Sequence, residues 1–256
     1  MTKIIRLFEQ HTNCDDILHM VYGISSNEYF DCVFVAPHWD IQKIFTDNDT
    51  NIKPFAKTDD TIAYEINHNN KRYLYITLSM GAPNVIDFCL ACHKQNCDKY
   101  VFLGSAGALV PEIHIGDFII PEYSISGDGA SLYLNDTLDT SNMFKPAYSD
   151  ATLSKTIKDI CASQNITVAN GTPISVDSIF CEYAHLDKFI EMGANAIEME
   201  SAAFFAAMKY IKKSAAAVLV VSDNTSANQP LMDKDDATRI KYRTARQNVQ
   251  QILKQI

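Results

Sequence analysis

Two carboxylates, Glu198 and Glu200, are separated by a single residue within residues 195–201 (NAIEMES), where a short apolar stretch meets a polar segment. Residues 194–199 predict a strand, and residues 201–212 predict a helix with small and apolar residues once per turn. Glu198 and Glu200 suit polyol recognition, because each carboxylate oxygen can accept a hydrogen bond from one of two adjacent hydroxyls. The alternative is that Glu200 is only an acidic residue at the start of a helix, where the helix dipole favours negative charge.

Four further stretches carry small and acidic residues in a set order: residues 102–109 (FLGSAGAL), 115–121 (IGDFIIP), 128–131 (DGAS) and 220–224 (VVSDN). Together with residues 195–201, they resemble the nucleoside phosphorylase family, which includes purine nucleoside phosphorylases, uridine phosphorylases and methylthioadenosine/S-adenosylhomocysteine nucleosidases. The resemblance covers about residues 30–255. It implies an enzyme that cleaves the N-glycosidic bond of nucleosides. Phosphate as the nucleophile would give free base and ribose 1-phosphate, and water would give hydrolysis.

By this resemblance, Glu200 binds the ribose hydroxyls and Met199 packs under the sugar. Asp223, preceded by Ser222, matches the acid that faces N7 of a purine. Cleavage develops positive charge on the ribose and negative charge on the departing base, so Glu200 and Asp223 are the expected catalytic residues. An acid that protonates N7 must keep its proton near neutral pH, which burial at the end of the expected strand 215–221 would provide. The alternative is that Asp223 only caps or turns the chain.

Small residues follow the expected strand 100–103. Ser105, Ala106 and Gly107 predict a turn in which the backbone comes close to a ligand and directs its amide groups towards it. A tight turn that merely needs glycine is the alternative. A similar turn, residues 79–84 (SMGAPN), places Gly81 before a helix, and in the family this turn borders the active site.

The resemblance favours a purine as the base. Uridine phosphorylases read a pyrimidine with a Gln and an Arg in a loop that corresponds to residues 177–182 (DSIFCE), which contain neither. Ile179 or Phe180 would stack on a base instead, as apolar and aromatic residues do in purine enzymes. The loop at residues 128–131 points the other way, towards the uridine branch.

The nucleophile is where the sequence departs from the family. Phosphorylases carry a Gly-Asp-Pro-x-Arg stretch and an Arg before the small-residue turn, since a phosphate dianion needs bidentate cationic partners. Here the corresponding residues are 35–39 (VAPHW) and Phe102, so both arginines are missing. What remains for phosphate is Ser105, backbone amides and Lys57, near the position of an arginine that the family supplies from a neighbouring subunit.

Three interpretations of this departure stay open. Phosphorolysis would rely on Lys57 and the amides, with phosphate as co-substrate. Hydrolysis would use Asp40 to activate water, as a carboxylate does in the nucleosidase branch, although Asp40 is also an ordinary helix-start acid. A homologue without catalysis would only bind nucleosides.

Composition is compatible with each of these interpretations. A net charge of −9 and a pI near 5.2 argue against nucleic acid and anionic membrane surfaces as partners. The N-terminus has no apolar stretch long enough for a signal peptide, and no later apolar run approaches the length of a membrane span. We therefore expect a soluble, cytoplasmic protein. We expect no metal and no organic cofactor; Cys89, Cys92, His93 and Cys97 have zinc-like spacing, but core packing is favoured because they lie in an amphipathic pattern with no second ligand pair.

The elements that must position these residues alternate between strands and helices. With 256 residues, 47% of them hydrophobic, the chain predicts one α/β domain over residues 1–256, a three-layer α/β/α arrangement with a central mixed, mostly parallel sheet. Ligands collect at the carboxyl ends of strands in such folds. Residues 48–60 are expected to be loop and residues 113–121 a strand. The resemblance implies a homo-oligomer, a dimer or a trimer of dimers. His11, His19 and His38 are candidates for contacting the 5′ end of the nucleoside.

Overall fold

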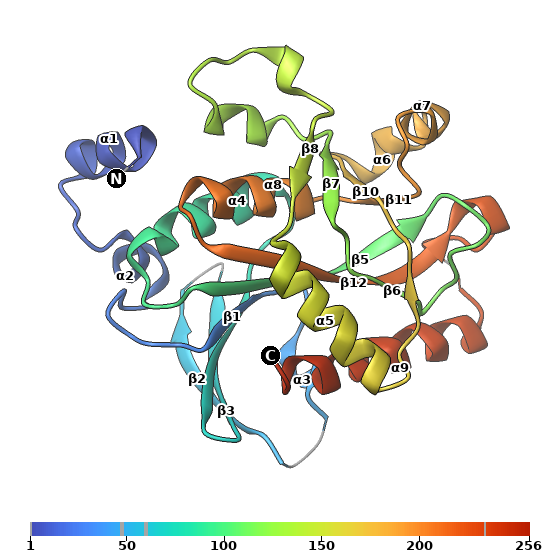
Figure 1. Ribbon diagram of the computed structural model, residues 1–256, viewed down its shortest axis with the longest axis horizontal. Helices are drawn as coiled ribbons and strands as arrows, with labels where there is room; N and C mark the ends of the chain where they lie inside the picture. Colours follow the sequence, from blue (N-terminus) through green and yellow to red (C-terminus); the bar gives the residue numbers. More distant parts are fainter. Residues whose placement is uncertain (1, 47–48, 59–60, 233) are drawn as a thin grey trace.

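In the computed structural model, which describes residues 2–46, 49–58, 61–232 and 234–256, the chain forms one α/β domain around a mixed sheet (Figure 1). The main path of the sheet runs in the order β2 (Asn51–Lys57), β3 (Ile62–His68), β4 (Lys71–Thr77), β1 (Cys32–Val35), β5 (Lys99–Ala108), β11 (Ala196–Glu198), β10 (Pro173–Ser175), β7 (Tyr123–Ser126) and β8 (Pro146–Tyr148). On the other side of β5 lie β12 (Ser214–Asn224), β6 (Phe118–Ile119) and β9 (Val168–Ala169).

The centre of the sheet is parallel and its edges are mixed. β5 pairs in parallel with β1 and with β12, and it then pairs antiparallel with β11 through Gly107 and Ala108. β2, β3 and β4 form an antiparallel meander at one edge. This arrangement confirms the predicted mixed, mostly parallel sheet.

Helices cover both faces of the sheet. α4 (Ala82–Ala91) and α8 (Ser201–Tyr210) pack together on one face, with α1 (Lys3–Thr12) and α2 (Ile17–Tyr22) beside them (Figure 1). α3 (Ile41–Ile44), α5 (Ala151–Ser163) and α9 (Asp236–Leu253) lie on the opposite face. The short α6 (Ile179–Glu182) and α7 (Leu186–Glu191) follow β10 and precede β11. The three predicted layers are therefore present.

β12 shows why the central strands have continuous apolar sequences. Along this strand Ala215, Ala217, Leu219 and Val221 belong to the core under α4 and α8, whereas Ala216, Val218 and Val220 belong to the core under α5 and α9. A strand covered by helices on both faces has no polar side. The alternation also fixes which residues at the end of β12 point towards each layer.

Three local predictions were wrong. Residues 104–107 do not form a turn, because β5 continues through them while paired with β12. Of the predicted loop 48–60, residues 51–57 form an edge strand whose side chains are largely exposed, which explains its polar, loop-like composition, and residues 48, 59 and 60 lie outside the described residues. Of residues 113–121, only Phe118–Ile119 form a strand.

Within the ranges given above, no helix is both long enough and apolar enough to cross a membrane.

Candidate functional site

A cavity of about 270 Å³ opens where β1, β4, β11 and β12 end. The structure brings most of the predicted site residues into its wall: Ser105, Gly107, Ile179, Met199, Glu200, Ser222 and Asp223. These residues come from β5, α6, the junction of β11 with α8, and β12. The cavity therefore collects residues that are more than 100 positions apart in the sequence, at the edge of the sheet that the topology predicted.

Glu198 and Glu200 have different hydrogen-bond partners at the start of α8. Glu198 accepts hydrogen bonds from the backbone amides of Glu200 and Ser201, at 2.9 and 2.7 Å, and from the Ser175 hydroxyl at 2.5 Å. Glu200 is the N-cap residue, but its side chain makes no capping hydrogen bond. Its Oε1 instead accepts the Gly81 amide at 2.7 Å. Because Glu198 satisfies the helix start, Glu200 is left to face the cavity.

Both carboxyl groups are buried, with exposed fractions of 6% for Glu198 and 8% for Glu200. Burial, and then the nearby charge of Glu198, raises the pKa of Glu200 to about 8. Burial also raises the pKa of Glu198, against the hydrogen bonds that it accepts. The ligand-free site therefore favours a protonated Glu200 at neutral pH.

Asp223 lies at the end of β12, where the pairing with β5 shifts register between Val221 and Asp223. Such an irregularity changes the direction in which a side chain points. The Asp223 side chain is buried, and its Oδ1 accepts the Ser222 hydroxyl at 2.5 Å. Burial raises the pKa of Asp223, and the opposing effects of Ser222 and Lys234 are smaller. The capping role belongs to Asn224, whose side chain accepts the Ala227 amide, so Asp223 does not cap the following turn.

Gly107 makes room for this acid. A Cβ atom at residue 107 would lie 2.9 Å from Asp223 Oδ2, closer than packed atoms allow. Ala106 is buried in the core and is not part of the cavity wall. Glycine is thus needed in the middle of a strand, where it lets the Asp223 carboxyl lie against the backbone of β5.

α6 contributes one residue that the sequence predicted and one that it did not. Ile179 lines the cavity, whereas Phe180 points to solvent with an exposed fraction of 93%. Glu182, one turn later, also lines the cavity. Burial, and then the charge of Asp223, raises the pKa of Glu182 to about 7. A carboxyl at this position had no motif in the sequence to mark it.

Several predicted residues lie outside the cavity wall. Asp40 is the N-cap of α3, and its Oδ1 accepts the Gln42 amide at 3.0 Å. Lys57 is exposed on the edge strand β2. Of the three histidines considered for the 5′ end, His38 lines the cavity and His11 and His19 do not.

The Asp128 loop is not part of this wall either. Asp128 is fully buried and accepts hydrogen bonds from Ser126 and from the amide and hydroxyl of Ser131. Its bonds tie together the loop between β7 and the 3-10 turn that follows.

Three residues that sequence reasoning missed form one corner of the cavity. Trp39 follows β1, and Tyr242 and Arg246 are one turn apart on α9. The Trp39 indole N–H lies 3.2 Å from Ser105 Oγ, and the Tyr242 hydroxyl lies 2.5 Å from the same atom. The Arg246 guanidinium stacks 4.6 Å from the centre of the Trp39 ring. The i, i+4 spacing on an amphipathic helix was the only signal that could have paired Tyr242 with Arg246.

The cysteines lie elsewhere. Cys89, Cys92 and Cys97 are buried in the core under α4 and α8, and burial raises the pKa of each thiol. His93 is within 3.1 Å of Glu9. Over the residues that the structure describes, no three His, Cys, Asp or Glu side chains are grouped to hold a metal ion.

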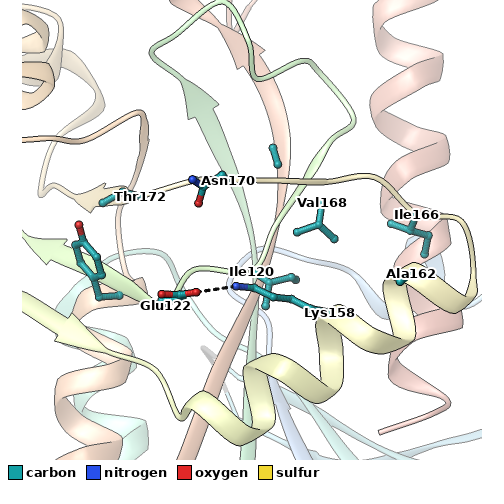
Figure 2. Close-up of a pocket in the computed structure, with 11 residues that line it drawn as sticks. Ile120, Glu122, Lys158, Ala162, Ile166, Val168, Asn170 and Thr172 are labelled. Atoms are coloured by element: carbon teal, nitrogen blue, oxygen red, sulfur yellow. Dashed lines mark hydrogen bonds and ion pairs between the residues drawn. The ribbon is translucent and has the colours of Figure 1, made fainter.

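A larger hollow of about 420 Å³ lies between α5 and the segment that carries β9 (Figure 2). Figure 2 shows Lys158 of α5 directed at Glu122, and Nζ and Oε1 of this pair are 3.2 Å apart. Glu122 is mostly exposed and its charge is already paired with Lys158. The hollow has greater volume but lacks a cluster of buried acids, so we place the chemistry in the smaller cavity.

Comparisons with known proteins identify the family and the fold. A family profile described as "Phosphorylase superfamily" matches residues 36–256. The chain is similar to a purine nucleoside phosphorylase, DeoD-type, from Levilactobacillus brevis, with 24% identity over 162 residues that cover 63% of this chain and 67% of the relative. The DeoD-type enzyme from Brevibacillus brevis is 26% identical over 159 residues, 61% of this chain and 66% of its own length.

Solved structures share the fold. The crystal structure of uridine phosphorylase from Vibrio fischeri matches with a TM-score of 0.76 and 19% identity, over 91% of this chain and 94% of that one. Purine nucleoside phosphorylase from Toxoplasma gondii, solved in complex with immucillin-H, matches with a TM-score of 0.71 and 12% identity, over 91% and 92%.

Proposed function

Because the chain belongs to the phosphorylase superfamily, we propose that it cleaves the N-glycosidic bond of purine nucleosides with phosphate, releasing the free base and ribose 1-phosphate. The observation that carries this proposal is the meeting of two buried acids, Asp223 and Glu200, in one cavity. In this proposal Asp223 donates a proton to the base and Glu200 holds the sugar.

In the proposed reaction an oxygen of phosphate forms a bond to C1′ while the bond from C1′ to N9 breaks. The electron pair of that bond passes into the purine ring, and Asp223 gives its proton to N7. Asp223 then takes up a proton again, balanced by the proton that the new phosphate ester loses. Glu200 binds the ribose hydroxyls: its protonated oxygen donates to one hydroxyl and its other oxygen, which accepts the Gly81 amide, can accept from the next. No step in this scheme requires a metal or an organic cofactor.

A purine as the base is supported by Asp223, because N7 is an atom that only a purine offers to this acid. Burial raises the pKa of Asp223, which favours the protonated form that donates. Ile179 in the cavity wall supplies an apolar surface for the ring. The purine enzymes among the sequence relatives support the same choice.

The positions of Asp40 and Arg246 support phosphate, and not water, as the nucleophile. Asp40, the residue that would activate water, has its carboxylate engaged at the start of α3. Phosphate requires a cationic partner, and Arg246, which lines the cavity, is such a group.

We also propose a homo-oligomer in which a neighbour completes each site. Lys57 is exposed on an edge strand, as a residue offered to a neighbouring subunit must be. Light scattering on the purified protein would test this, and a monomer at working concentrations would contradict it.

The experiment that tests the reaction is release of free base from adenosine, inosine, guanosine, uridine and methylthioadenosine, each with and without phosphate. We expect phosphate-dependent release from purine nucleosides only. Asp223→Asn should reduce purine turnover by about 100-fold or more, since a general acid contributes about 10²–10⁴ in rate. Release without phosphate would show a hydrolase, and equal turnover of uridine would show that the acid does not select the base.

A further inference from the structure

Trp39 stands where the resemblance places one of the two missing phosphate-binding arginines, and it is firmly held. The ring is buried, with an exposed fraction of 4%. Its backbone carbonyl accepts the hydroxyls of Tyr75 at 2.9 Å and Thr77 at 3.3 Å. Its indole N–H donates to Ser105 Oγ at 3.2 Å. The residue is therefore a fixed wall of the cavity and not a side chain that swings into solvent.

Arg246, on the C-terminal helix α9, places a positive charge beside this wall. Its guanidinium lies 4.6 Å from the centre of the Trp39 ring and 5.6 Å from that of Tyr242. None of the ion pairs among the described residues involves Arg246. The guanidinium reaches the Tyr242 hydroxyl, but its buried Nε finds no hydrogen-bond partner in the described part of the chain. A buried donor of this kind is costly to leave unpaired, so its presence in a cavity wall indicates a ligand that accepts from it.

The groups beside Arg246 are also donors. Tyr242 and Ser105 join hydroxyls at 2.5 Å, and either can donate once rotated. Lys234 lies beside this group but outside the cavity wall, with Nζ 5.7 Å from the centre of the Tyr242 ring, and its charge acts on Asp223. Asp223 and Glu200 come from other elements, and neither is in an ion pair with Arg246, although the charge of Asp223 acts on the Tyr242 hydroxyl. One part of the cavity is thus rich in donors and positive charge.

We propose that Arg246, Tyr242 and Ser105 bind the phosphate nucleophile, with the Arg246 guanidinium, supplied by α9, standing in for the arginine that Trp39 has displaced. The assignment of this anion as the nucleophile rests on the proposed phosphorolysis. The planar guanidinium can donate two parallel hydrogen bonds to one phosphate group, and stacking on Trp39 fixes its plane beforehand. The two hydroxyls supply further donors to the same oxygens.

Binding of inorganic phosphate, measured by titration calorimetry without nucleoside, tests this site separately from turnover. Arg246→Met keeps a long side chain on the Trp39 ring and removes the charge, so the fold should survive. We expect it to weaken phosphate binding about 10- to 100-fold, the loss of one or two charge-assisted hydrogen bonds. Arg246→Lys should lie between Arg246→Met and the unmodified protein. Arg243→Ala, an exposed arginine on the same helix, is the matched control and should bind phosphate as the unmodified protein does.

Phosphate affinity unchanged in Arg246→Met overturns the proposal. A second arm titrates a nucleoside 5′-monophosphate. If Arg246→Met loses affinity for this nucleotide and keeps its affinity for inorganic phosphate, the guanidinium reads a phosphate group of the substrate, and the nucleophile site is refuted. If Arg246-dependent phosphate binding occurs without any phosphate-dependent base release, the anion site stands and the proposed phosphorolysis fails.

Discussion

Glu200→Gln tests whether the buried carboxyl titrates as its surroundings require. Burial, and then Glu198, raises the pKa of Glu200 to about 8 from its ordinary 4.5. Between these values the folded protein holds a proton at Glu200 that the unfolded chain has released. Since the unfolded state binds fewer protons in this window, the free energy of unfolding falls by about 1.4 kcal/mol per pH unit as the pH rises. This stabilisation is complete below pH 4.5 and is lost as the pH passes about 8.

Glutamine cannot titrate, but it keeps an oxygen that can accept the Gly81 amide, which lies 2.7 Å from Glu200 Oε1. Urea unfolding of both proteins at pH values from about 5 to about 8 gives the difference in slope, in which groups that do not interact with residue 200 cancel, whereas Glu198, whose charge acts on Glu200, contributes to the difference. We expect the Glu200→Gln slope to be less steep by about 1 kcal/mol per pH unit. Glu112→Gln, which changes an exposed carboxylate, should leave the slope as it was. Equal slopes in the unmodified protein and Glu200→Gln would refute the reasoning, because the carboxyl would then be ionised in the folded state.

Three further predictions concern the residues around the acids. Glu198→Ala should lower the free energy of unfolding by about 2–4 kcal/mol in urea, since it leaves buried amides at the start of α8 unpaired; the exposed Glu191→Ala serves as control, and equal losses in both would contradict the capping role. Gly107→Ala should reduce turnover of inosine about tenfold or more with the circular dichroism unchanged, because its Cβ would meet Asp223 Oδ2 at 2.9 Å and displace the acid; a normal rate would show that the carboxyl tolerates the shift. Asp40→Asn, which can still cap α3, should leave base release within about twofold of the original rate, and a large loss would bring back the hydrolytic interpretation.

The fold was predictable because its strongest signals are local. Apolar runs such as residues 215–221 marked the buried central strands, and helical periodicity marked α5 and α9. β2 was missed because an edge strand with exposed side chains has no apolar face to show in the sequence. Glycine usually interrupts a strand, so the sequence predicts a turn at residues 104–107. In the structure these residues stay in β5, where a Cβ atom at Gly104 would meet the Phe102 ring and one at Gly107 would meet the Asp223 carboxyl.

The site was predictable only where its residues lie in short motifs. Glu200 and Asp223 stand at strand ends within recognisable stretches, and the structure brings both into one cavity. Both carboxyl groups line the cavity, and the sequence did not reveal that Glu198 accepts the amides at the start of α8 while Glu200 accepts the Gly81 amide, because either carboxylate is equally suited to a helix start.

Arg246 shows the limit most clearly. It lies 141 positions after Ser105, on a helix whose pattern indicates only amphipathic packing, and no spacing rule connects it with the first strand. What brings Arg246 to Trp39 is the docking of α9 on the sheet, a tertiary event that local patterns do not encode.

The position of β5 has a further consequence for motion. Ser105 and Gly107 belong to a central strand that pairs with β12 along its whole length, and on its other side with β1 as far as Phe102 and with β11 from Gly107. Amides in the middle of a sheet exchange only when the sheet opens, so hydrogen exchange at Gly107 should approach the rate set by global unfolding. α6 has no buried residue and no strand partners. Adjustment to an incoming nucleoside should therefore come from α6, while β5 keeps its position.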